Sequence, residues 1–278
     1  MLAIVQFSFT CCNSLYASVK SLPADTSRKK MLADNIFENK VTIKETNVVF
    51  PEIISGHEKQ SMDYIEKFVQ NKRNYLLNIF SRSKKYFPKA KSILHKYNVP
   101  QEYVMLMALE SGFKSNVVSS AGAVGYWQFM DEVAKEYGLR VAQKNMEKKI
   151  IHRKGKKITI SKKRISPDDR KNFIKSTIAA ARYLQDRMKN LDNDWLLVAA
   201  SYNCGVGNVW DAMKRTGKTS PDFWDIKKYL PAETRAYVMN FITLNVISNN
   251  YENFCNNNMI FRNVSTEITL VPSVVFMD

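Results

Sequence analysis

One glutamate follows a run of apolar residues and is the first candidate for chemistry in this chain. Residues 103–109 read Tyr-Val-Met-Leu-Met-Ala-Leu, and Glu110 comes next, just ahead of Gly112. A helix that is apolar on every face is buried, and a glycine ends it naturally. Burial and the negative end of the helix dipole both raise the pKa of such a carboxyl group. A carboxylic acid that keeps its proton near neutral pH can protonate a glycosidic oxygen. The alternative is a surface glutamate at a frayed helix end.

The cysteines and histidines do not point to a metal or cofactor. The chain has three His and four Cys, and the cysteines are Cys11, Cys12, Cys204 and Cys255. None of their spacings resembles a zinc site, so we expect no metal and no cofactor. Whether Cys204 and Cys255 pair in an oxidising compartment is left open by the sequence.

The elements that must position Glu110 are helical. Besides 100–111, apolar residues recur at helical spacing in segments that we expect to be helices: 61–98, 126–137, 172–190, 194–203 and 231–250. Pro88 predicts the start of a new helix within the first of these. One exception is a β-hairpin near 149–164, with Gly155 in its turn. No segment alternates strands with helices, so the sequence predicts a mostly α fold with a small β-hairpin insertion.

The chain is strongly basic, with a net charge of +16 over 278 residues. Between Lys144 and Lys175 there are 13 Lys or Arg and 3 Asp or Glu, so this stretch alone contributes +10. Such a balance suits an anionic partner, which could be nucleic acid, a membrane surface or an acidic wall polymer. No apolar run of about 18 residues lies beyond the N-terminus, so we expect no membrane-spanning helix in the body.

Four blocks of sequence resemble a known family. They are Leu106-Met-Ala-Leu-Glu-Ser-Gly-Phe113, Ala121-Gly-Ala-Val-Gly-Tyr-Trp-Gln-Phe-Met130, Ala200-Ser-Tyr-Asn-Cys-Gly205 and Leu230-Pro-Ala-Glu-Thr-Arg-Ala-Tyr237. In this order and spacing they are similar to the lytic murein transglycosylases, above all the membrane-bound type D group. The resemblance covers roughly residues 60–250 and implies a lysozyme-like α-helical catalytic domain of the goose type.

The resemblance also implies a mechanism and a set of site residues. Glu110 matches the sole catalytic acid and base of the family. Substrate-binding roles fall on Ser111, Gln128, Tyr202, Asn203 and Tyr237. Such enzymes cut the β-1,4 bond between N-acetylmuramic acid and N-acetylglucosamine without water and leave a 1,6-anhydro sugar.

Two other functions are weighed against this one. A hydrolytic muramidase commonly uses a second carboxylate, and the loop between Ser111 and Met130 has no Asp or Glu. Asp131, Asp168 and Asp169 remain open as that second group. A non-catalytic wall-binding scaffold is the other rival, and the joint presence of Glu110, Gln128 and the Tyr202–Asn203 pair argues against it. A nucleic-acid partner is not expected, because no recognition motif accompanies the charge.

The chain divides into segments with different expected roles. Those segments are a possible signal segment at 1–17, an arm or linker at 18–60, the catalytic domain at 61–250 with its basic insertion at about 144–165, and a tail at 251–278 without a LysM repeat. The first segment resembles a secretory signal although no Lys or Arg precedes its apolar run, and Cys11 or Cys12 leaves a lipoprotein anchor open. We therefore expect export to the periplasm or cell envelope, with membrane association through this segment. The basic insertion is either a solvated hairpin or a contact for peptide-stem carboxylates or another anionic wall polymer.

Overall fold

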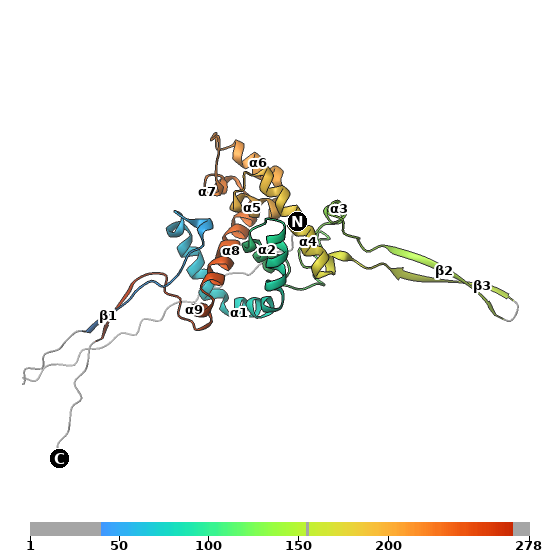
Figure 1. The fold of residues 1–278 in the computed structure, drawn as a ribbon, viewed down its shortest axis with the longest axis horizontal. Coiled ribbons are helices and arrows are strands. Elements are labelled where there is room, and N and C mark those ends of the chain that lie inside the picture. Colours follow the sequence, from blue (N-terminus) through green and yellow to red (C-terminus); the bar gives the residue numbers. More distant parts are fainter. Residues whose placement is uncertain (1–39, 154–155, 269–278) are drawn as a thin grey trace, which may run out of the picture. The chain divides into compact units, whose positions relative to one another are not determined.

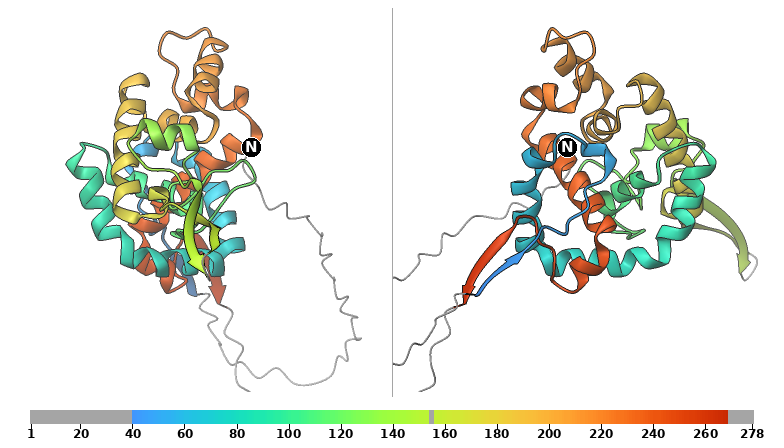
Figure 2. Two further views of the ribbon diagram at one scale, coloured as in Figure 1. Left: turned by 90° about the vertical axis from the view of Figure 1, so that its right-hand side faces the viewer. Right: turned by 60° about the vertical axis from the view of Figure 1, so that its left-hand side comes forward.

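The computed structural model describes residues 40–153 and 156–268 and divides into two units (Figure 1). One unit contains Asn47–Phe261. The other includes strands β1 (Lys40–Lys44) and β4 (Val264–Ile268), which pair antiparallel with Lys40 opposite Ile268. Figure 2 shows these two strands running side by side. The possible signal segment at 1–17, with Cys11 and Cys12, lies outside the described residues.

Helix α1 (Glu58–Lys96) runs along the larger unit after a short 3-10 helix at Glu52–Ile54. Its backbone departs from helical geometry at Lys72, whereas Pro88 lies inside the helix. The expectation that Pro88 starts a new helix is therefore wrong. The helix continues through Pro88 because Ala90 and Leu94, in the turns that follow, are fully buried, and burial of one face supplies most of the stability of a helix in a protein.

Helix α2 (Val104–Ser111) lies in the core and carries Glu110 in its last turn. Residues 104–108 are all buried, and Gly112 ends the helix in the left-handed conformation, with φ of 55°. Arg82 of α1 donates a hydrogen bond of 2.8 Å from Nε to the Gly112 carbonyl oxygen. The prediction of a buried helix that ends at Gly112 is confirmed.

Helix α2 packs against α1 and α8 (Ala232–Asn249), and further helices complete the larger unit. They are α3 (Asp131–Glu136), α4 (Phe173–Asn190), α5 (Trp195–Cys204), α6 (Val206–Lys214), α7 (Phe223–Ile226) and α9 (Tyr251–Cys255). Short 3-10 helices occur at Gln101–Tyr103, Asp169–Lys171 and Lys227–Tyr229. The ring of Tyr103, just before α2, stacks on Phe241 of α8 with centroids 5.7 Å apart. This contact fixes the entry to α2 against α8, and Figure 1 shows the two helices at the centre of the unit. The described fold is mostly helical, as predicted.

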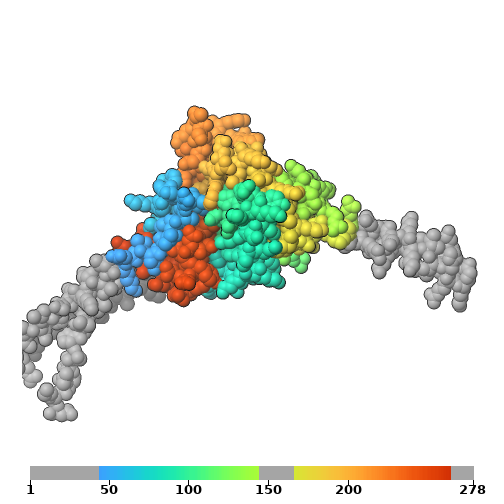
Figure 3. Space-filling model, viewed as in Figure 1, coloured from blue at the N-terminus to red at the C-terminus, as the bar shows by residue number. Residues whose placement is uncertain are grey.

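The larger unit reaches beyond the predicted limits of the catalytic domain. The side chain of Asn250 accepts a hydrogen bond from the Val49 backbone N–H at 2.8 Å and donates one to the Val49 carbonyl at 2.7 Å. Figure 3 shows the blue segment near residue 50 lying against the red segment near residue 250. Parts of the predicted arm and tail therefore contribute to the same packed body.

The predicted helix at 126–137 is shorter than expected. Helix α3 begins at Asp131, and residues 125–130 form a loop instead. Gly125 and Gln128 both have positive φ, of 86° and 49°, which no right-handed helix contains. Tyr126, Trp127 and Phe129 of this loop are buried without helical geometry, so their spacing misled the prediction.

Strands β2 (Lys144–Arg153) and β3 (Lys156–Ile165) pair antiparallel, with Lys144 opposite Ile165. At their base, the backbones of Gln143 and Ser166 are joined by a hydrogen bond of 3.0 Å. Gly155, the expected turn residue, lies outside the described residues. None of the helices in the described part of the chain combines the length and hydropathy that a membrane-spanning segment needs.

Candidate active site

Glu110 of α2 and Tyr237 of α8 are in direct contact. The Tyr237 hydroxyl donates a hydrogen bond of 2.6 Å to Oε1 of Glu110. Loss of solvation raises the pKa of Glu110 to about 7, although the bond from Tyr237 lowers it and the charge of Glu233 raises it further. Near neutral pH the group is thus close to an even mixture of acid and carboxylate. The alternative of a surface glutamate at a frayed helix end is wrong, because the group is desolvated and bonded to a second helix.

Three tyrosines surround this carboxyl group. Burial raises the pKa of Tyr237 and Tyr202 well above the usual value, and the charge of Glu110 raises both further. Burial and the charge of Glu110 also raise the pKa of Tyr183 on α4. The rings of Tyr183 and Tyr202 pack edge-to-face, with centroids 5.3 Å apart. All three phenols therefore keep their protons near neutral pH. Tyr237 donates its hydrogen bond to Glu110, whereas Tyr202 donates to the Trp127 carbonyl oxygen.

Ser111 and Tyr202 attach the loop at residues 125–130 to two helices. Ser111 donates from Oγ to the carbonyl oxygen of Tyr126 at 2.7 Å, and Tyr202 donates to that of Trp127 at 2.7 Å. The indole of Trp127 is fully buried and donates to Thr177 Oγ1 at 3.1 Å, so this tryptophan belongs to the core. In this structure both hydroxyl groups hold the protein backbone, and their contacts with sugar stay predictions.

Gln128 and Asn203 are also engaged within the protein. Gln128 donates from Nε2 to the carbonyl oxygens of Gly125 at 2.8 Å and of Val117 at 3.1 Å. Asn203 accepts a hydrogen bond of 2.8 Å from Thr234 at its Oδ1 atom. Thr234 lies one turn before Tyr237 on α8, so this bond joins the end of α5 to the segment that carries Tyr237.

Two residues near Glu110 were missed by the sequence analysis. Glu233 influences Glu110 through its charge, and Tyr183 lies against Tyr202. Glu233 could have been found, since it stands four residues before Tyr237 and so shares its helix face. Nothing in the pattern of the helix at 172–190 distinguishes Tyr183 from other residues of its buried face.

The three aspartates that the sequence left open are all bound to basic residues. Asp131 and Asp168 form ion pairs with Arg170, with closest distances of 2.5 Å and 2.8 Å. Asp169 pairs with Arg140 at 3.0 Å and with Lys175 at 2.9 Å. These pairs stabilise the turn after β3.

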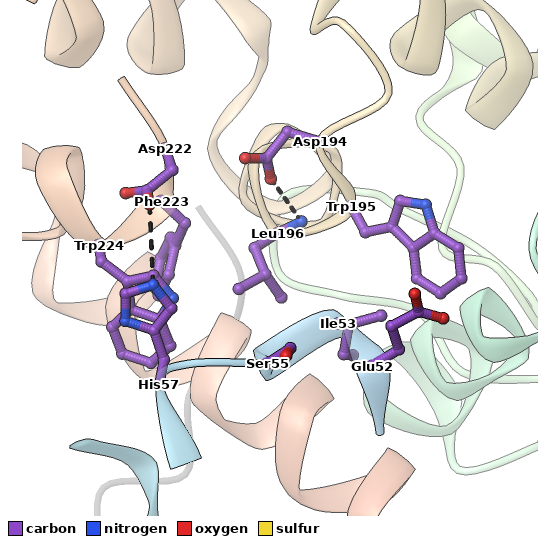
Figure 4. Close-up of a pocket in the computed structure, with 10 residues that line it drawn as sticks. All are labelled: Glu52, Ile53, Ser55, His57, Asp194, Trp195, Leu196, Asp222, Phe223 and Trp224. Atoms are coloured by element: carbon purple, nitrogen blue, oxygen red, sulfur yellow. Dashed lines mark hydrogen bonds and ion pairs between the residues drawn. The ribbon is translucent and has the colours of Figure 1, made fainter. Parts of the chain in front are cut away.

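A separate cavity of about 460 Å³ lies between the segment at residues 52–57, the start of α5 and α7 (Figure 4). In it His57 stacks on Trp224 with centroids 4.8 Å apart, and Asp194 caps α5 by accepting from the Leu196 N–H at 2.9 Å. None of the six predicted site residues lines this cavity. Cys204 and Cys255 are both free thiols.

Comparison of the sequence with known proteins identifies a matching domain family and two relatives. Residues 89–224 match the Transglycosylase SLT domain. The chain is 32% identical over 192 residues to the membrane-bound lytic murein transglycosylase D of Escherichia coli (strain K12), an alignment that covers 68% of this chain and 37% of that protein. It is 28% identical over 137 residues to a putative tributyltin chloride resistance protein of Alteromonas sp. (strain M-1), covering 48% of this chain and 55% of that protein. The chain thus spans less than two thirds of the length of either relative.

Solved structures of lytic transglycosylases are also similar. An inactive mutant of lytic transglycosylase Slt from Pseudomonas aeruginosa has a TM-score of 0.43 and 19% identity, covering 62% of this chain and 24% of that one. The 70 kDa soluble lytic transglycosylase of Escherichia coli has a TM-score of 0.42 and 16% identity, covering 78% of this chain and 38% of that one. On the sequence matches, residues 89–224, which include Glu110, the loop at residues 125–130 and the Tyr202–Asn203 pair, form a transglycosylase SLT domain related to that of a membrane-bound lytic murein transglycosylase.

Proposed function

We propose that this protein is a lytic transglycosylase that cleaves peptidoglycan glycan strands. It acts as a carbon–oxygen lyase on the β-1,4 bond between N-acetylmuramic acid and N-acetylglucosamine and leaves 1,6-anhydro ends. The observation that carries the proposal is the desolvated Glu110 carboxyl group, with a pKa of about 7, bound to Tyr237 inside an SLT domain.

One carboxyl group is sufficient for this reaction. Protonated Glu110 gives its proton to the glycosidic oxygen as the bond to the muramic acid C1 breaks. The N-acetyl oxygen of the same sugar stabilises the positive charge at C1. The Glu110 carboxylate then takes the proton of the C6 hydroxyl, whose oxygen closes the ring on C1 and releases the N-acetyl oxygen. The proton returns to Glu110, so the group is ready for another turnover.

The environment of Glu110 suits a group that must give and then take a proton. Burial favours the neutral acid, whereas the hydrogen bond from Tyr237 favours the carboxylate. A pKa near the working pH keeps both the acid step and the base step accessible. Tyr237 thus acts mainly in the second half of the reaction, when Glu110 is charged.

The other site residues are proposed to hold the sugar. With Oδ1 of Asn203 bound to Thr234, its Nδ2 hydrogens are the donors that we assign to the N-acetyl carbonyl oxygen. Tyr202, Gln128 and Ser111 fix the loop at residues 125–130, which we propose forms one wall of the sugar groove.

A muramidase is the second candidate, and Glu233 is the observation that favours it. Its charge raises the pKa of Glu110, so it is a second carboxylate near the catalytic acid. A hydrolase can use such a group as a nucleophile or to activate water. A non-catalytic wall-binding scaffold is the third reading, and the perturbed pKa of Glu110 argues against it, since such shifts gather at functional sites.

Mass spectrometry of the fragments released from purified sacculi tests the proposal. The wild type should release fragments with 1,6-anhydro-muramic acid ends, and Glu110→Gln should release almost none. Reducing muramic acid ends would identify a muramidase instead. Equal release by wild type and Glu110→Gln would remove Glu110 from the mechanism.

Two further parts of the proposal concern partners and location. We propose that β2 and β3 form a basic β-hairpin insertion that contacts peptide-stem carboxylates or another anionic wall polymer. The charge of +10 between Lys144 and Lys175 supports this. We also propose that the protein works in the cell envelope, where peptidoglycan lies, and that its N-terminal segment directs it there.

A further inference from the structure

The loop at residues 125–130 connects the parts of the candidate site. Its carbonyl oxygens at Tyr126 and Trp127 accept hydrogen bonds from Ser111, the neighbour of Glu110, and from Tyr202 on α5. A displacement of the loop therefore moves the ends of both α2 and α5 relative to each other. A residue that fixes the position of this loop therefore also fixes the positions of Ser111 and Tyr202 near Glu110.

Arg170 holds the far end of the loop. Its side chain is only 4% exposed, and Nη1 donates to the Phe129 carbonyl oxygen at 3.1 Å and to Asp131 Oδ1 at 2.5 Å. Nε and Nη2 donate to the two oxygens of Asp168 at 3.0 Å and 2.8 Å. One guanidinium thus bridges the loop end to the turn that follows β3.

The backbone of Arg170 lies against the near end of the loop. At Gly125, which has φ of 86°, an added Cβ would lie 2.1 Å from the Arg170 carbonyl oxygen. Only glycine allows so close an approach. Arg170 therefore touches both ends of the loop, through its main chain at Gly125 and through its side chain at Phe129 and Asp131.

We propose that Arg170 is a positioning residue for the reaction at Glu110, which rests on the proposed function. It fixes the loop at residues 125–130, and through this loop it fixes Ser111 and Tyr202 beside the catalytic acid. Its planar guanidinium is suited to this work, because it has five donors in fixed directions and bridges several acceptors at once. A lysine has one nitrogen and cannot reach Phe129, Asp131 and Asp168 together.

The test compares Arg170→Lys with Arg140→Gln. Arg140 is the matched control, since it binds an aspartate of the same turn, Asp169, but its side chain is 68% exposed and its guanidinium bonds Asp169 rather than the loop. Both variants are assayed for anhydro-sugar release at a temperature where circular dichroism shows them folded. We expect Arg170→Lys to lower kcat about 100-fold with KM changed less than about threefold, because misplacement by about 1 Å has such an effect. Arg140→Gln should stay within about twofold of the wild type.

A second measurement separates positioning from stability. Hydrogen exchange of a peptide that covers residues 125–131 should be faster in Arg170→Lys than in wild type or Arg140→Gln. If Arg170→Lys does not fold, Asp131→Ala removes one acceptor of Nη1 and leaves the Asp168 contacts in place. We expect it to lower kcat by about three- to tenfold, with the same effect on loop exchange.

The inference is overturned if folded Arg170→Lys keeps the wild-type kcat, or if loop exchange is unchanged. It is also overturned if the loss of activity merely follows the fraction of unfolded protein. A wild type with no lytic activity would defeat the proposed function instead, and the exchange measurement would still show whether Arg170 holds the loop.

Discussion

Tyr237 donates a hydrogen bond of 2.6 Å to Glu110, although 127 positions separate them in the chain. This bond opposes the effect of burial and keeps the pKa of Glu110 at about 7. The two helices that carry these residues pack directly on each other. The pair therefore combines a structural contact with control of the proton that the proposed reaction needs.

Replacing Tyr237 with phenylalanine should raise the pKa of Glu110. The bond stabilises the carboxylate, so its loss leaves the effect of desolvation less opposed, and we expect the pKa of Glu110 to rise. Glu110 must start protonated, so kcat/KM falls as pH rises through this pKa. In Tyr237→Phe this fall should begin at higher pH, as measured by the pH profile of fragment release. An unchanged profile would show that Tyr237 does not control the proton.

Replacing Glu233 with glutamine should move the pH profile of fragment release to lower pH, opposite to the effect of Tyr237→Phe. The negative charge of Glu233 raises the pKa of Glu110, so its removal lowers that pKa, by less than about one unit for a partly solvated pair. A transglycosylase should still release anhydro-sugar products with this variant. If the protein is a muramidase that uses Glu233, turnover should drop by more than about 100-fold instead.

Glu110 should make the folded protein less stable at high pH. Its folded pKa of about 7 lies above the ordinary value of 4.5, so the folded state binds the proton more tightly than the unfolded state does. The stability from this group is fully present below about pH 4.5 and is lost as pH rises through about 7. At pH 8, Glu110→Gln should therefore raise the free energy of unfolding by about 1–3 kcal/mol over wild type, with little difference near pH 4.5. Denaturant unfolding measures both values.

Glu132→Gln is the control for this comparison, because Glu132 is exposed at the start of α3. Its effect should stay within about 0.5 kcal/mol at both pH values. A gain at pH 8 no larger than that of the control would mean that Glu110 is well solvated.

The sequence predicted the position of Glu110 but not its partners. An apolar stretch followed by Gly112 is a local signal, and it was sufficient to place a half-buried acid at the end of a buried helix. Tyr237 was assigned only through the family resemblance, since its contact depends on how α8 packs on α2. Arg170 lay within the basic run from Lys144 to Lys175 with nothing in the pattern to single it out, yet it is buried between two aspartates and a backbone carbonyl. Composition alone does not show which of the 13 Lys and Arg residues between Lys144 and Lys175 forms enough ion pairs and hydrogen bonds to be buried.

Changing Gly125 to alanine should destabilise the protein more than the same change at Gly122. Both glycines have positive φ, of 86° and 91°, so alanine is strained at either position. At Gly122 an added Cβ meets nothing within 4 Å, whereas at Gly125 it would lie 2.1 Å from the Arg170 carbonyl oxygen. We expect about 1 kcal/mol for Gly122→Ala and about 3 kcal/mol or more for Gly125→Ala, from denaturant unfolding. Equal effects would mean that the loop and the turn after β3 separate easily.

Removing charge from the basic hairpin should weaken binding to the cell wall. The test variant changes five lysines of the segment to glutamine: Lys154, Lys156, Lys157, Lys162 and Lys163. The control variant changes five exposed lysines of α1: Lys59, Lys67, Lys72, Lys89 and Lys96. Both variants lose the same total charge, so only its location differs. We expect the hairpin variant to sediment less with purified sacculi at low salt and the difference to shrink above about 0.15 M salt, where the screening length is about 8 Å. If both variants bind equally well, binding to the sacculi depends on the net charge of the whole chain and not on the location of charge in the β2–β3 segment.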